Sequence, residues 1–250
     1  MDSPVKKPYH FRLIRITYLI TLSILVIIFL REGYPRRFYQ RINTLMGTQN
    51  QAPHSFADNE YYREQTDFFN LYCGQKNIVM LGNSLTYRMS WAELLNRQDI
   101  ANRGIGSDIT AGFLHRLNSI FPLNPGICFI EGGVNDIAFH IPPDTTILNL
   151  MMLVDTLQKQ HIKTALTTIT LVADNYPAAE DFNHQAKLLN ERISQLARQK
   201  KAFLIDLNQH LTDGNFLKPE YSIGDGLHLT SKAYLIWKQK IMDILEQEKI

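Results

Sequence analysis

Three short polar motifs carry side chains that could act together in nucleophilic catalysis. The first contains Ser84, which follows the apolar run 77–82 and precedes a helical pattern. A serine hydroxyl at a strand-to-helix turn can serve as a nucleophile if a base takes its proton, or it can simply cap the helix. The GxSxG motif of α/β-hydrolases is absent, because Thr86 stands where its second glycine would be.

The second and third motifs supply an amide and an imidazole. Asn135 follows the apolar run 127–132 and a second glycine, Gly133, so its amide could donate a hydrogen bond at the sheet edge or belong to an ordinary Gly-Asn turn. Asp225 precedes His228 by three residues. Across a tight turn, this carboxylate could fix the tautomer of the imidazole and stabilise the imidazolium. The alternative is a turn followed by a helix-capping histidine.

Each motif alone is weak evidence for a catalytic site. Together, the motifs supply a nucleophile, a base, a carboxylate that orients the base and a donor for an oxyanion. An unactivated serine hydroxyl needs a base, and the base needs orientation. A tetrahedral intermediate also needs preorganised hydrogen-bond donors. The other seven of the eight histidines have no comparable carboxylate partner, and we interpret them as surface or packing residues.

Short apolar runs alternate with helical patterns along the chain, and these elements would have to gather the motifs. We expect strands at 77–82, 99–102, 127–132, 164–172 and 202–207. We expect helices near 59–71, 85–97, 109–119, 144–161, 178–200 and 230–248. Strands that are apolar throughout and separated by helices predict a parallel sheet covered on both faces. Sites form at the carboxyl ends of such strands, so the pattern predicts a three-layer α/β domain with its site at that edge.

Four blocks of sequence surround the polar motifs. They are IVMLGNSLT at 78–86, NRGIGSDITAGFLHRL at 102–117, IEGGVNDI at 130–137 and DGLHLT at 225–230. In type and order, these blocks resemble the SGNH (GDSL-type) esterase/lipase family, in particular its branch similar to platelet-activating-factor acetylhydrolase. The resemblance covers residues 59–250. It implies a flavodoxin-like fold with five parallel strands in the order 2-1-3-4-5, and a serine hydrolase that uses no metal or other cofactor.

Carried over by position, the resemblance implies that Ser84 is the nucleophile, His228 the general base and Asp225 the carboxylate that orients the base. The first block departs from the family pattern at Asn83, where aspartate is usual. A neutral amide could still brace the turn, so we expect activity to survive this departure.

The resemblance also implies an oxyanion hole. Its donors would be the Asn135 side chain and the backbone N–H groups of Ser84 and Ser107, with Gly106 and Gly133 as supporting residues. A glycine is usual where this chain has Ser107. Serine carries the same backbone N–H, but it must adopt backbone angles that glycine reaches more easily.

The N-terminal part of the chain differs in character from the rest. Residues 16–30 contain no charge, and at about 1.5 Å per residue they span roughly 22 Å of a bilayer core of about 30 Å. No pair of small residues follows at the spacing of a cleavage site. We therefore expect a basic tail and uncleaved transmembrane anchor over 1–31, a juxtamembrane linker over 32–58 and the hydrolase domain over 59–250. A cleaved signal peptide and a buried core helix are the alternatives.

Composition and charge limit the possible functions. Of the 250 residues, 45% are hydrophobic and 20% are charged, which is ordinary for a globular protein. Residues 1–41 hold eight basic and two acidic residues, a net charge of +6, which leaves −4 on the remainder of a chain whose total is +2. A mildly acidic domain argues against nucleic-acid binding. The two cysteines, Cys73 and Cys128, have no neighbours at zinc-binding spacing, so no metal is expected.

The sequence thus predicts a membrane-anchored carboxylic-ester hydrolase that works through an acyl-enzyme. Its domain is expected outside the cytoplasm, because a short tail precedes the apolar run and a large domain follows it. By family tendency, the substrates would be small-molecule, glycan or lipid esters, with acetyl and other short acyl groups first. A lysophospholipase or thioesterase on the same site, and a catalytically inactive binding domain, are the alternatives. Nothing in the sequence indicates an oligomeric state.

Overall fold

The computed structural model describes Phe56, residues 59–71 and residues 74–250. The predicted anchor over 1–31 and nearly all of the predicted linker lie outside the described residues. Within the described ranges, no helix is both long enough and apolar enough to cross a membrane.

Five strands form one parallel sheet. They are β1 (Ile78–Gly82), β2 (Ile100–Gly104), β3 (Ile127–Glu131), β4 (Lys163–Thr167) and β5 (Phe203–Ile205). Their order is β2-β1-β3-β4-β5, which confirms the predicted flavodoxin-like topology. In the observed register, Gly82 of β1 lies beside Gly104 of β2 and Glu131 of β3. The loops that follow these three strands therefore start at neighbouring points on one edge.

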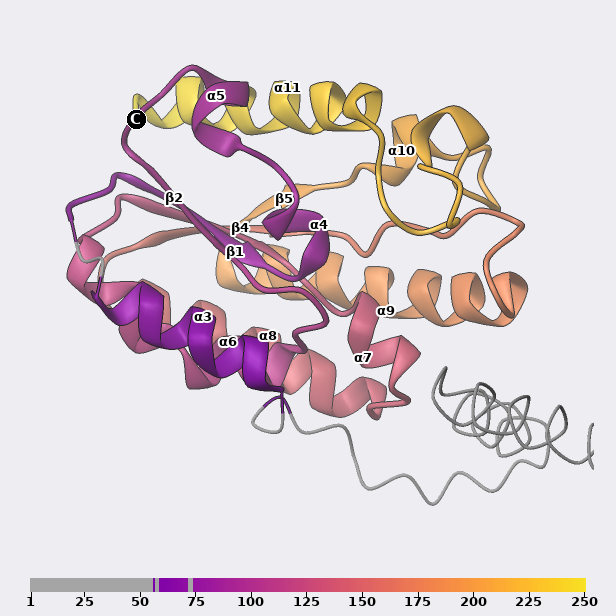
Figure 1. Ribbon diagram of the computed structural model, residues 1–250, viewed down its shortest axis with the longest axis horizontal. Coiled ribbons are helices and arrows are strands. Elements are labelled where there is room, and N and C mark those ends of the chain that lie inside the picture. Colours follow the sequence, from indigo (N-terminus) through magenta and orange to yellow (C-terminus); the bar gives the residue numbers. More distant parts are fainter. Residues whose placement is uncertain (1–55, 57–58, 72–73) are drawn as a thin grey trace, which may run out of the picture. The chain divides into compact units, whose positions relative to one another are not determined.

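Helices cover both faces of the sheet, as Figure 1 shows, and confirm the three layers. One face carries α5 (Trp91–Leu95), α10 (Asn208–Leu211) and α11 (Ser231–Glu248). The other carries α3 (Glu60–Leu71), α6 (Thr110–His115), α8 (Pro143–Lys159) and α9 (Ala179–Lys200). The remaining helices are α4 (Ser84–Tyr87), α7 (Val134–Ala138) and the short 3-10 turns Leu117–Ser119, Phe121–Leu123 and Pro219–Tyr221.

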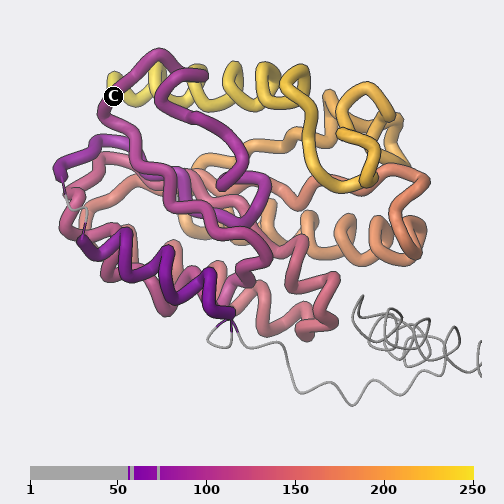
Figure 2. The backbone as a smooth tube through the Cα atoms, viewed as in Figure 1, coloured from indigo at the N-terminus to yellow at the C-terminus, as the bar shows by residue number. Residues whose placement is uncertain are grey.

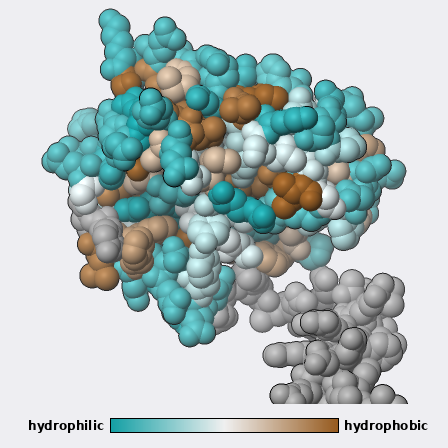
Figure 3. All heavy atoms as spheres, turned by 45° about the horizontal axis from the view of Figure 1, so that its top comes forward, coloured by the Kyte–Doolittle hydropathy of each residue, from teal (hydrophilic) through white to brown (hydrophobic). Residues whose placement is uncertain are grey.

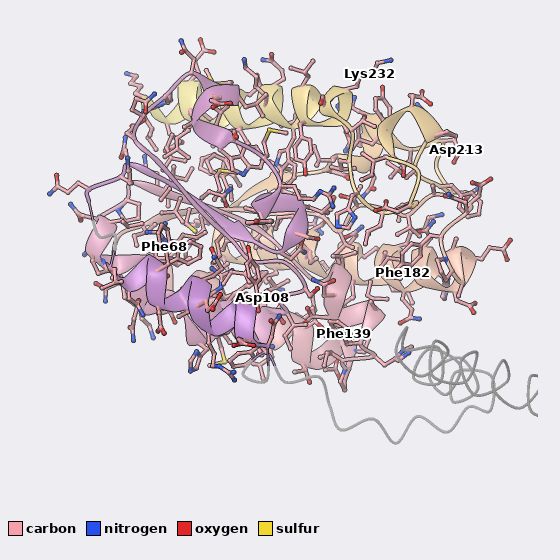
Figure 4. All side chains as sticks on the ribbon, in the orientation of Figure 1. Phe68, Asp108, Phe139, Phe182, Asp213 and Lys232 are labelled. Carbon is pink, nitrogen blue, oxygen red and sulfur yellow. The ribbon has the colours of Figure 1, made fainter. Side chains whose placement is uncertain are left out.

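Each face of the sheet has its own apolar core. Trp91 of α5 and Trp237 of α11 are buried against one face, and Phe113 of α6 is buried against the other. The apolar stripe expected on α9 is buried, and it consists of Phe182, labelled in Figure 4, and Ala186, Leu189, Ile193 and Leu196. On the side of the molecule seen in Figure 3, the apolar surface is broken into separate patches among hydrophilic residues.

The predicted strand over 164–172 is too long, because β4 ends at Thr167. Beyond it, asparagine side chains take the place of a neighbouring strand. The N–H groups of Ile169 and Val172 donate to the side-chain oxygens of Asn190, at 2.7 Å, and Asn183, at 2.8 Å. These hydrogen bonds satisfy the extended backbone after β4 although no strand pairs with it there. The apolar pattern alone cannot distinguish such a segment from a strand of the sheet.

The predicted helix over 85–97 is also wrong, since it is divided into α4 and α5. The Asn102 amide of β2 donates to the carbonyls of Thr86, Tyr87 and Met89 at 3.0–3.3 Å. The Trp91 indole donates to the Thr86 carbonyl at 2.9 Å. These side chains occupy carbonyls that a continuous helix would use, so the chain turns away after one turn.

Candidate active site

Ser84 is the first residue of α4 and follows the end of β1 by two positions. Asn83 holds the turn, because its side-chain oxygen accepts a hydrogen bond from the Leu85 N–H at 2.8 Å. Its amide nitrogen donates to the Glu131 carboxylate at 3.0 Å. On the other side, the Tyr234 hydroxyl of α11 donates to the Leu85 carbonyl at 2.7 Å. The expected bracing role of Asn83 thus corresponds to a pair of defined hydrogen bonds.

The loop before α11 brings the third polar motif to this turn. Figure 2 shows this loop, in yellow, returning to the end of the sheet from which the chain leaves β1. His228 Nε2 lies 2.9 Å from Ser84 Oγ, and His228 Nδ1 lies 2.7 Å from Asp225 Oδ2. The carboxylate holds the ring proton on Nδ1, which leaves Nε2 to accept from the serine hydroxyl. The structure therefore joins the three predicted residues in one chain of hydrogen bonds.

The loop is shaped to keep Asp225 ionised. The second carboxylate oxygen, Oδ1, accepts from the backbone N–H groups of Leu227, at 3.0 Å, and His228, at 2.9 Å. Partial burial raises the pKa of Asp225, but the hydrogen bonds from the His228 ring and these two N–H groups outweigh it and hold the pKa below its usual value. At neutral pH the carboxylate is charged, as the stabilisation of an imidazolium requires.

The predicted oxyanion donors lie on the loop after β2 and on α7. Ser107 adopts the left-handed backbone conformation, with φ of 61°, so it reaches the region that favours glycine. The Asn135 amide donates to the Asp108 carbonyl at 2.8 Å and thereby links α7 to this loop. A primary amide has two N–H groups, so this hydrogen bond leaves one for an oxyanion.

The two supporting glycines differ in their surroundings. Gly133 has φ of 110°, and a Cβ there would lie 2.7 Å from the Ile169 side chain, so both the backbone and the packing require glycine. Gly106 has no atom within 4 Å of an added Cβ, and its φ is not in the left-handed region. Its neighbour Ser107 takes that conformation instead.

A buried ion pair beneath the loop was not predicted from the sequence. The Arg116 guanidinium donates to Asp108 at 2.8 Å, and both side chains are fully buried. It also donates to the carbonyls of Arg103, at 2.6 Å, and Gly82, at 3.0 Å. One side chain thus ties the ends of β1 and β2 to the loop that carries Ser107. Figure 4 labels Asp108, whose pKa burial raises to about 6 although the Arg116 charge lowers it.

Two further buried carboxylates were also missed. Asp136 of α7 accepts from the Thr110 backbone N–H at 3.1 Å and from the Thr146 hydroxyl at 3.2 Å, so it joins α7 to α6 and α8. Glu131, at the end of β3, lies under the Ser84 turn. Glu131 directly precedes the paired glycines of the third block and Asp136 lies three positions after them, so membership of that block was the available signal. Across the described ranges, no group of His, Cys, Asp and Glu could hold a metal ion.

Comparisons with known proteins identify the family of the chain. The model of the GDSL-like lipase/acylhydrolase family matches residues 80–236, which include every predicted site residue. Among curated proteins, an N-acylneuraminate cytidylyltransferase from Streptococcus agalactiae is 27% identical over 177 residues, 69% of this chain and 39% of that protein. The chain thus spans well under half the length of the curated relatives that it matches.

Solved structures show the same fold. A GDSL-like lipase from Bacteroides thetaiotaomicron has 24% sequence identity and a TM-score of 0.66, over 75% of this chain and 98% of that one. The esterase EstA from Pseudoalteromonas, in a structure inhibited by monoethylphosphonate, has 22% identity and a TM-score of 0.55, over 68% of this chain and 96% of that one.

Proposed function

The chain belongs to the GDSL-like lipase/acylhydrolase family, and from this premise we propose that it is a carboxylic-ester hydrolase with Ser84 as its nucleophile. The observation that carries the proposal is the unbroken chain of hydrogen bonds from Ser84 through His228 to Asp225. Ser84 begins α4, and His228 lies in the loop before α11, 144 positions further along the chain, so the fold brings the two side chains together.

The arrangement accounts for each proton and bond in ester hydrolysis. Ser84 Oγ attacks the ester carbonyl while His228 Nε2 takes its proton, and Asp225 stabilises the imidazolium. The oxyanion accepts hydrogen bonds from the Asn135 side chain and from the backbone N–H groups of Ser84 and Ser107. His228 then returns the proton to the leaving alcohol, and an acyl-enzyme remains. In the second half, His228 takes a proton from water, which attacks the acyl group, and Ser84 leaves with that proton as the acid is released.

We propose esters of short acyl groups, with acetylated sugars first, as substrates. A hollow beside the loop that carries Asp225 and His228 is the basis for our proposal about the alcohol part of the substrate. Its lining includes Asp174, Glu180 and Asp181, together with Tyr176, whose backbone lies against Gly226. Three carboxylates disfavour an anionic alcohol such as a phosphate headgroup and suit a neutral, hydroxyl-rich one. The curated relative is named for an N-acylneuraminate, but that protein is much longer, so neither that sugar nor the cytidylyl transfer is proposed for this chain.

The membrane anchor remains part of the proposal and rests on the sequence alone. The uncharged residues 16–30 would hold the domain at a membrane, and the short basic tail before them favours a domain outside the cytoplasm. In such a place the enzyme would meet acylated glycans or lipids at the cell surface.

One experiment separates an esterase from an inactive binding domain. A chromogenic acetyl ester is incubated with the wild-type protein and with Ser84→Ala, each with and without a phosphonate that reacts with activated serine. We expect turnover only in the untreated wild type, and a phosphonate adduct located on Ser84 by mass spectrometry. Turnover in Ser84→Ala above about a tenth of wild type would exclude Ser84 as the nucleophile, because triad residues act as a unit.

A further inference from the structure

A buried carboxylate lies directly beneath the turn that carries Ser84. Glu131 is 3% exposed, and Asn83 and Thr86 are 0% and 1% exposed. One Glu131 oxygen accepts from the Asn83 amide at 3.0 Å, and the other accepts from the Thr86 hydroxyl at 3.3 Å. The two donors stand on either side of Ser84, so a single carboxylate holds both ends of the nucleophile turn.

The identity of residue 83 is constrained by this contact. The Asn83 side-chain oxygen already accepts from the Leu85 N–H, so its second polar atom must face Glu131. An amide presents a donor there. An aspartate would present an oxygen about 3 Å from a carboxylate oxygen, and two ionised carboxylates at that separation repel each other strongly until one of them takes a proton.

We propose that Glu131 is a positioning residue for the nucleophile turn, and that Asn83 and Glu131 form a matched amide–carboxylate pair in which each residue requires the other. The consequence for activity rests on the proposed role of Ser84. The coupling between the two side chains does not depend on that role.

The groups around Glu131 that the structure describes supply no positive charge that could compensate a second carboxylate. Tyr234 of α11 and Asp136 of α7 are its electrostatic neighbours. Burial raises the pKa of Glu131 to about 7, and the hydrogen bonds from Asn83 and Thr86 oppose this rise. Neither of the side chains that donate to Glu131, Asn83 and Thr86, is a cation, so a second negative charge at residue 83 would have no compensation from them.

The test is a cycle of four proteins: wild type, Asn83→Asp, Glu131→Gln and the double variant, which exchanges amide and carboxylate. Steady-state kinetics with an acetyl ester are measured from pH 6 to pH 9, and unfolding by urea at the same pH values. We expect Asn83→Asp to lose about tenfold or more in kcat at pH 8, with little change in KM and with recovery towards pH 6, where one carboxylate can take a proton. The double variant should regain most of the loss in both kcat and unfolding free energy.

A control separates this pair from a general effect of removing a carboxylate. Glu248→Gln removes the partner of Lys163 in a partly exposed ion pair between the end of α11 and the start of β4, and it should leave the pH profile of kcat as it is in wild type. The proposal is overturned if the double variant is no better than Asn83→Asp, or if Asn83→Asp shows the wild-type pH profile and stability. If Asn83→Asp does not fold, a folded double variant still supports the pair, and an unfolded one overturns it.

Failure of the proposed function has a different signature. In that case the wild type would show no turnover, or Ser84→Ala would retain it, and the kinetic measurements would no longer report on the nucleophile turn. The double-variant recovery in unfolding free energy would still report the coupling of Asn83 and Glu131.

Discussion

At the scale of single residues, the two proposed oxyanion donors outside the nucleophile turn should respond differently to mutation. Asn135 contributes a side chain, and removal of one such donor costs about 10²–10³ in turnover. We therefore expect Asn135→Ala to lower kcat by that factor with little change in KM, because the hydrogen bond strengthens in the transition state. Ser107 contributes only its backbone N–H, so Ser107→Gly should change kcat by less than about tenfold, or about 1.4 kcal/mol.

Steady-state kinetics of both variants, with circular dichroism to confirm folding, check this prediction. Asn135 also donates to the Asp108 carbonyl, so the thermal unfolding of Asn135→Ala must be compared with wild type. A mild effect of Asn135→Ala together with a severe effect of Ser107→Gly would assign a chemical role to the serine hydroxyl and contradict the proposed oxyanion hole.

The hydrogen bonds of Asp225 predict a pH dependence of stability as well as activity. Its pKa is below the usual value in the folded protein, so the carboxylate stabilises the fold above its unfolded pKa of about 3.9. This contribution is lost as the pH falls below that value and through the lower pKa of the folded protein. Asparagine does not titrate. The difference in unfolding free energy between wild type and Asp225→Asn should therefore shrink as the pH is lowered from about 5 to about 3.

Urea unfolding at a series of pH values measures that difference, and a value that stays constant with pH would contradict the hydrogen-bonded state of Asp225. At neutral pH the same variant should lose about 10³–10⁴-fold in kcat, because asparagine can neither hold the required imidazole tautomer nor stabilise its charge.

The site residues could be predicted from the sequence to the extent that their partners lie in the same motif or in a known block. Asp225 and His228 are three residues apart, and a carboxylate at that distance from an imidazole suggests an interaction. Glu131 could not be recognised in this way, because its partner Asn83 is 48 positions away and the register of β1 beside β3 brings them together. Arg116 is only eight positions from Asp108, in the same block, but it also donates to the Gly82 carbonyl, 34 positions away, which only the fold brings beside it.

At the scale of elements, the prediction succeeded where one side of an element is continuously apolar. The α9 stripe and the fully buried strands β1 and β3 are examples. It failed where a side chain replaces a backbone partner, as Asn190 does beside β4 and Asn102 does after α4. Apolar patterning reports burial, and burial is the same whether a backbone group is paired with a strand or with an asparagine.

The buried pair of Arg116 and Asp108 should be the strongest single brace between elements. Arg116→Leu leaves Asp108 buried without its cation and also frees the carbonyls of Gly82 and Arg103. We expect a loss of about 3–5 kcal/mol in unfolding free energy, and the added substitution Asp108→Asn should restore part of it.

Urea unfolding measures this loss, and the partly exposed pair of Lys200 and Asp155 provides a control outside the core. Lys200→Met should cost no more than about 1 kcal/mol, because solvent reaches this pair and screens its charges. If Arg116→Leu costs no more than Lys200→Met, the ion pair does not brace the strand ends.

At the scale of the whole molecule, the predicted anchor and the domain can be separated by truncation. Every proposed site residue lies between Asn83 and His228, and the described fold begins after the uncharged run 16–30. Removal of residues 1–41 also removes a net charge of +6. We expect the truncated protein to be soluble without detergent and to hydrolyse acetyl esters with the kcat of the full chain, while the full chain sediments with membranes.

Sedimentation of cell extracts and esterase assays on both forms check this prediction. If the truncated protein does not fold, residues 16–30 are a core helix of the domain. If the full chain is found shortened and free of membranes, those residues are a cleaved signal peptide.

The side of the membrane on which the domain lies is a separate prediction. Four basic residues lie on each side of the apolar run, so the charge of the flanks does not decide the orientation. The tail before the run is short and the domain after it is large, and on this ground we expect the N-terminus inside and the domain outside. Protease added to intact cells with a permeabilised outer layer should digest the domain and abolish ester hydrolysis. A cytoplasmic marker protein must stay intact in the same sample, and a domain that is cleaved only after lysis would reverse the predicted orientation.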